Sequence, residues 1–155
     1  MPEYLARTQA VYEACQRHLQ DIDAAGSPIE SYLTEHILVV LCGEIQRALY
    51  SIADDRAQRS SDPALHAFVS EASVKLLRSV QKNEVATFIG FFGPAYRESF
   101  NNLLDDRDVT TYNNAVRQRH QAAHHGGGTM TFRELPDAIA AANKILDSAR
   151  TALTP

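Results

Sequence analysis

An arginine and a histidine five residues apart are the pair in this sequence best suited to phosphate chemistry. Arg119 and His124 stand in the stretch 112–128, which reads YNNAVRQRHQAAHHGGG. RNA can be cut without a metal when its 2′-hydroxyl attacks the neighbouring phosphorus. That reaction needs a group that moves protons near neutral pH, which histidine supplies, and fixed positive charge at the phosphate, which arginine supplies. The pair therefore favours metal-free, cofactor-free cleavage of RNA.

Three further residues of this stretch are candidates for supporting roles. His120 and Arg117 share one predicted helix face with His124, and Arg117 is a candidate for binding RNA. His125 follows His124 directly, so either histidine could be the working one. On spacing alone the evidence is weak, because basic residues in the last turn of a helix also stabilise its dipole.

Arg119 is unusual because the helical period places it in an apolar stripe. At about 100° per residue it shares a face with Tyr112 and Val116. A buried guanidinium without a partner costs several kcal/mol, and its donors suit a carboxylate or a phosphate. Glu44, close to the apolar stripe of an earlier helix, is the candidate partner. Arg119 and His124 lie about 140° apart on a regular helix, so they converge only through a distorted last turn or between two copies of the chain.

The segment RHQAAHHG resembles the signature of the HEPN superfamily, in which an arginine, a polar residue and three more residues precede a histidine. It is similar in particular to the RiboL-PSP-HEPN type and its solo relatives, where the motif often reads RN-x-x-AHG. The likeness continues into the glycines and the T-x-x-E-L start of the next helix, and loosely back through FIGFFGPAYRESFNNLL to Glu44. Two departures are His120 in place of the usual asparagine, and His125 between His124 and Gly126.

This resemblance implies an all-helical domain, a homodimer in which the motif helices face each other, and metal-independent endoribonuclease activity that leaves 2′,3′-cyclic phosphate ends. His124 would move protons, Arg119 would hold the phosphate, and His120 would orient them. The resemblance also suggests a role as a toxin or in defence against phage, with a protein antitoxin or a defence-system partner. Some HEPN domains have lost catalysis and only bind or scaffold.

Two other classes of function stay open for the same residues. His120 and His124 are four apart, and HQAAH mimics the H-E-x-x-H zinc motif. Gln121 replaces the glutamate base, however, and only His125 or Glu134 is conceivable as a third ligand, so no metal site is expected. The other class is a non-catalytic RNA-binding, nucleotide-binding or protein-interaction module. It explains everything except an arginine in an apolar stripe.

Length and composition predict one all-α domain over residues 1–155. A chain of this length can bury roughly two-thirds of its unfolded surface, and long stretches without turn signals favour helices over sheet. Short loops between amphipathic stretches predict an up-and-down bundle of about five to seven helices. The predicted helices cover about 3–25, 28–59, 63–80, 83–92, 95–104, 108–125 and 136–153.

Several helix starts carry local signals. Capping boxes are predicted at Ser27 and Thr131, and Asp62 should cap the third helix. Asp108 or Thr110 should cap the helix that carries the motif. The apolar stripe of the third helix is predicted to face inward: Leu65, Phe68, Val69, Ala72, Leu76 and Val80.

The charge balance limits where RNA could bind. The net charge is −4, so the chain has no overall field that attracts nucleic acid, and an RNA site must be a local basic patch. The N-terminus lacks the features of a signal peptide, and the longest apolar run, Ile37 to Cys42, is far short of a membrane span. We therefore expect a cytoplasmic protein without a membrane segment.

Overall fold

The computed structural model describes residues 4–125 and 129–154, with the side chains of 122–125 outside that description. Within these residues the chain is an all-helical bundle, which confirms the predicted fold class. Its elements are α1 (Ala6–Asp21), α2 (Pro28–Ala57), α3 (Pro63–Leu76), α4 (Lys82–Gly90), α5 (Pro94–Asn102), α6 (Asp106–His125), the 3₁₀ turn η1 (Phe132–Glu134) and α7 (Leu135–Leu153).

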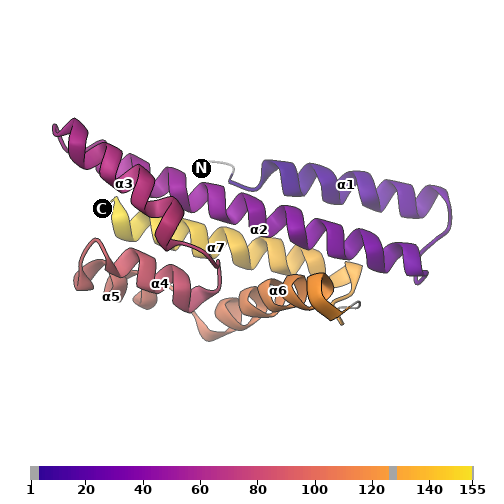
Figure 1. Ribbon diagram of the computed structural model, residues 1–155. Coiled ribbons are helices and arrows are strands. Elements are labelled where there is room, and N and C mark those ends of the chain that lie inside the picture. Colours follow the sequence, from indigo (N-terminus) through magenta and orange to yellow (C-terminus); the bar gives the residue numbers. More distant parts are fainter. Residues whose placement is uncertain (1–3, 126–128, 155) are drawn as a thin grey trace.

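Four long helices form the body of the bundle. Along the chain α1, α2, α6 and α7 run in alternating directions, and α2 packs beside α7 at the centre (Figure 1). The shorter α4 and α5 pack together near the C-terminal end of α7, and α3 lies along one end of α2. The largest fully buried side chains come mainly from α2 and α7, and include Ile37, Leu38, Leu41, Ile45, Leu49, Ile52, Leu135 and Ile145.

α2 is the central helix because apolar residues lie on most of its sides. It buries residues all along its length, from Thr34 to Ala57. By length and composition α2 could cross a membrane, but half of its most apolar stretch is buried inside the bundle. Such burial is typical of the core helix of a packed domain.

Two of the predicted helix starts are confirmed. Asp62 accepts a hydrogen bond from the amide of Ala64 at 2.9 Å and begins α3. Thr131 and Glu134 form the capping box before α7, because the amide and the hydroxyl of Thr131 both donate to the Glu134 carboxylate, at 2.7 and 2.8 Å. These hydrogen bonds hold the pKa of Glu134 below its ordinary value.

The capping box predicted at Ser27 is wrong. The Ser27 side chain makes no capping bond, although α2 does begin directly after it at Pro28. The Glu30 carboxylate instead accepts the amide of Gly26, which has a positive φ of 76°. The glycine turn thus brings a donor to Glu30 that the pattern of the box did not anticipate.

α6 begins earlier than predicted. Its first residue is Asp106, and the side chain of Asp105 accepts the amide of Asp108 at 2.8 Å. Asp105 is therefore the cap, in place of Asp108 or Thr110. The bond from the Asp108 amide is the main reason that the pKa of Asp105 is lowered.

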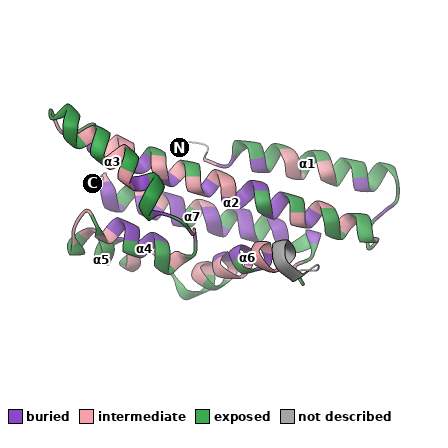
Figure 2. Ribbon diagram, viewed as in Figure 1, coloured by how far each residue is buried: buried purple, intermediate pink, exposed green. Residues whose placement is uncertain are grey.

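The inward-facing stripe predicted for α3 is wrong at Leu65, Phe68 and Leu76, whereas Val80 is buried and Val69 packs against the core. Phe68 is 69% exposed, and Leu65 and Leu76 are about half exposed, so most of α3 is solvent-facing (Figure 2). The period was recognised correctly, but α3 contacts α2 at the end of the bundle and no further described element covers its apolar face. The helix ends at Leu76, four residues before the predicted Val80.

Candidate functional site

A cavity of about 210 Å³ lies between α2, α6 and the segment that joins α3 to α4. We call it the cationic groove. Its charged lining residues are Arg78 and Arg119, accompanied by His120, and no carboxylate is found among the described residues that line it. Its other lining residues are Val39, Cys42, Gly43, Gln46, Ser79, Val80 and Val116.

Arg119 reaches this groove from the buried face of α6. Tyr112, Ala115 and Val116 of that face are each only 1% exposed, as the helical period predicted. Arg119 itself is half-buried, and its Nε is buried without a hydrogen-bond partner among the residues that the structure describes. A buried donor of a charged group that has no hydrogen-bond partner destabilises the folded protein. A ligand that offers an acceptor to this guanidinium would remove that cost.

The predicted pairing of Arg119 with Glu44 is wrong. The Glu44 carboxylate accepts the amides of Arg7 and Thr8, at 3.1 and 2.7 Å, and the Thr8 hydroxyl at 2.6 Å. Glu44 lies two residues after Cys42, about 200° around α2. Cys42 therefore faces the cationic groove, whereas Glu44 faces α1 and caps its first turn.

Cys42 does not balance the charge of Arg119. Burial raises the pKa of its thiol to about 11, although the nearby Arg119 charge acts in the opposite direction. The thiol is thus neutral at physiological pH. The positive charge in the groove stays uncompensated among the described residues.

The wall that carries Arg78 is fixed by α6. The hydroxyl of Tyr112 donates to the carbonyl of Val80, and the side chain of Asn113 accepts the amide of Lys82 at 3.0 Å. Burial raises the pKa of Tyr112 well above its ordinary value, so the hydroxyl keeps its proton and remains a donor. The segment between α3 and α4 is therefore held beside the groove.

Gln118 is a positioning residue that the sequence analysis missed. It is 4% exposed, and its amide group donates to the Thr129 hydroxyl at 2.9 Å and accepts the Thr129 amide at 2.7 Å. Both hydrogen bonds tie the chain after the glycines back onto α6. The available signal was its position three residues after Ala115, which places a polar side chain near the buried face.

The remaining predicted site residues fall into two groups. His120 is half-buried and lines the cationic groove beside Arg119, whereas Arg117 is exposed and lines a different surface cavity near the start of α7. His124 and His125 belong to the last turn of α6, but their side chains lie outside the described residues. The pairing of Arg119 with a histidine of this turn stays a prediction.

The described part of the chain holds no group of three or more metal-ligating side chains placed to share an ion. The zinc alternative depends on His124 and His125, whose side chains are not among the described residues. Comparison with known protein families, with curated proteins and with solved structures finds no match for this chain.

Proposed function

We propose that this protein is a metal-independent endoribonuclease of the HEPN type that cleaves RNA and leaves 2′,3′-cyclic phosphate ends. The observation that carries the proposal is the uncompensated positive charge of the cationic groove. The guanidinium of Arg119 has a buried, unpartnered Nε, and the described lining residues offer it no carboxylate. A planar guanidinium suits a phosphodiester, whose two non-bridging oxygens share one negative charge.

The proposed reaction needs only side chains of this chain. Arg119 holds the phosphate and stabilises the phosphorane as negative charge builds on it. His124, or His125 in its place, moves the proton as the 2′-oxygen bonds to phosphorus, the bond to the 5′-oxygen breaks and that oxygen gains a proton. His120 lines the same groove as Arg119, where it orients the scissile group.

A homodimer through the α2–α6 face is part of the proposal. An exposed stripe on α2 leads directly to the cationic groove, and its residues repeat at the alternating spacing of three and four that helix pairs use. Tyr32 is 69% exposed and Val39 is 49% exposed, and a side chain added at Gly43 would meet no described atom within 4 Å. The stripe consists of Ile29, Tyr32, His36, Val39 and Gly43.

The surroundings proposed for the enzyme follow from the resemblance and from its charge. We propose an RNA-cleaving toxin or defence protein in the cytoplasm, controlled by a protein antitoxin or another component of a defence system. Because the chain carries a net charge of −4, its substrate is a structured RNA or one delivered by a partner, not one gathered by a long-range field.

Cleavage of total cellular RNA tests the activity. Wild-type protein is incubated with RNA with and without EDTA, beside Arg119→Ala, His124→Ala and His125→Ala, and cyclic phosphate ends are mapped. Arg107→Ala is the matched control, because Arg107 is a basic residue of the same helix that lines a different surface cavity. We expect cleavage in EDTA that is lost in Arg119→Ala and in one histidine variant.

Each contrary outcome names a different function. Cleavage that EDTA abolishes indicates a zinc site at the histidines. Binding of RNA without cleavage indicates the non-catalytic module.

Dimerisation is tested separately with Val39→Glu, which should convert a dimer to a monomer in sedimentation and abolish cleavage. If Val39→Glu changes neither, the homodimer is rejected.

A further inference from the structure

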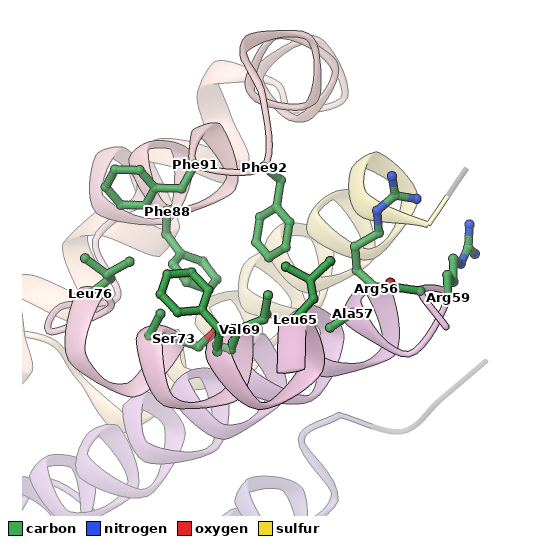
Figure 3. Close-up of a pocket in the computed structure, with 13 residues that line it drawn as sticks. Arg56, Ala57, Arg59, Leu65, Val69, Ser73, Leu76, Phe88, Phe91 and Phe92 are labelled. Atoms are coloured by element: carbon green, nitrogen blue, oxygen red, sulfur yellow. The ribbon is translucent and has the colours of Figure 1, made fainter. Parts of the chain in front are cut away.

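A second groove lies on the opposite side of the segment that joins α3 to α4. It has a volume of about 580 Å³, and the apolar stripe of α3 forms one wall while α4 and the residues after it form the other (Figure 3). We call it the phenylalanine groove. Its apolar lining includes Leu65, Phe68, Val69, Leu76, Phe88, Phe91 and Phe92.

Several of these apolar side chains are largely exposed to solvent. Phe68 and Phe91 are 69% and 61% exposed, and Leu65 and Leu76 are each about half exposed. They gather in one groove instead of lying singly over the surface, and contiguous apolar patches of this kind mark interaction sites. The stripe recurs at helical spacing along α3, whose 14 residues span roughly 21 Å.

Two arginines mark one end of the groove. Arg56 and Arg59 lie beyond Leu65 at this end, while Leu76 and Phe91 lie toward the other (Figure 3). Arg56 donates to the Tyr96 hydroxyl at 2.6 Å and stands over the Tyr96 ring, which fixes its place at the rim and leaves it further donors. No acidic residue is found among the described residues that line the groove.

We propose that the phenylalanine groove is the docking site for an amphipathic helix of a partner protein. Its apolar side chains, at positions i, i+3, i+4 and i+7, lie against the apolar face of α3. Acidic residues at one end of the partner helix meet Arg56, which keeps donors that Tyr96 does not use. This inference stands on its own and does not depend on ribonuclease activity.

Exposure disfavours a small amphiphile such as a fatty acid. Pockets for small ligands bury most of the ligand surface, whereas here two phenylalanines are more than half exposed.

Two labelled helical peptides test the proposal by fluorescence anisotropy. They share leucines at i, i+3, i+4 and i+7, and they differ only in carrying two glutamates or two lysines at one end. Both are titrated with the full-length wild-type protein, with Phe68→Glu and with Val74→Glu. Val74 is the matched control, because it is 59% exposed on α3 and does not line the groove.

We expect the acidic peptide to bind wild-type protein about tenfold more tightly than the basic peptide. Phe68→Glu should abolish binding, and Val74→Glu should leave it unchanged. The variant Arg56→Glu should remove the preference, while the comparison of peptides on wild-type protein holds whether or not that variant folds.

Four results would overturn the proposal. They are failure of the acidic peptide to bind, equal binding of the two peptides, binding that ignores Phe68→Glu, and binding that Val74→Glu weakens equally. Sedimentation and a laurate titration complete the test. A dimer that Phe68→Glu dissociates would assign the groove to a second copy, and laurate binding that needs Phe68, without peptide binding, would assign it to a small amphiphile.

Discussion

The two grooves on either side of the α3–α4 segment use arginine in different ways. In the cationic groove, Arg119 has a buried Nε with no partner among the described residues. In the phenylalanine groove, Arg56 is engaged by the hydroxyl and the ring of Tyr96. An arginine whose buried donor lacks a hydrogen-bond partner favours binding of an anion. An arginine that is held at the rim of a groove favours the orientation of a bound partner protein. We therefore propose different functions for the two grooves, although arginine lines both.

The largest expected effect separates the phenylalanine groove from the core. Phe100→Ala should lower the free energy of unfolding by about 3–5 kcal/mol, because Phe100 is fully buried and its loss leaves a cavity. Phe68→Ala should change it by less than about 0.5 kcal/mol, because Phe68 is 69% exposed. Urea unfolding measures both. A large loss in Phe68→Ala would show that α3 belongs to the core and that the groove is no docking surface.

A double comparison of arginines tests whether the two grooves have separate functions. Arg119→Ala should lower the rate of RNA cleavage by about 10²–10³-fold, because the phosphorane loses its charged donor. Arg56→Ala should leave that rate within about twofold, since Arg56 lines only the other groove. Rates are measured on one short RNA substrate at fixed salt. Equal losses in the two variants would contradict the division.

Substitution of Glu44 tests whether the cationic groove functions without a carboxylate of its own. Glu44→Gln should destabilise the protein by about 1–3 kcal/mol, because the cap on α1 loses its charged acceptor. Cleavage by the folded variant should be unchanged. Glu13→Gln is the control, since the Glu13 side chain accepts only an exposed side-chain bond from Gln9. A loss of cleavage without a loss of stability would show that Glu44 contributes to the site after all.

The smallest expected effect is a response of α3 to acid. Hydrogen bonds from Ser70 and His66 of α3 hold the pKa of Asp54 below its ordinary value. Their contribution is present above the unfolded pKa of this carboxyl and is lost as pH falls through its lower folded pKa. Amide exchange should therefore quicken in α3 before α4, which has no acidic cap, as pH falls below about 4, and Asp54→Asn should remove that difference. Identical acid profiles in the two helices would argue against it.

The sequence correctly predicted those features that depend on residues close together in the chain. The Thr131 capping box, the Asp62 cap and the buried face of α6 follow from side chains within one turn of each other. Tertiary contacts decided the rest. The period of the α3 stripe was predicted correctly, but periodicity does not say which face another helix covers. Glu44 fell near an apolar stripe, yet the side of α2 that it faces depends on where α1 packs.

The candidate site shows the same division. Arg119 and His120 were predicted from residue type and helical spacing, and the structure places both in one groove. Arg78 reaches this groove from a distant segment, and Gln118 reaches Thr129 across the glycines. Neither contact leaves a pattern in the sequence, because each joins residues that the fold alone brings together.

The paired hydrogen bonds between Gln118 and Thr129 have a consequence for how such a chain can vary. They fix the point at which the main chain rejoins the bundle before α7, so the number of glycines between the two helices is uncoupled from the register of the last helix. Adding or deleting one glycine should leave the thermal midpoint nearly unaltered while α7 keeps its place. The length of this stretch would then be free to vary on a constant scaffold.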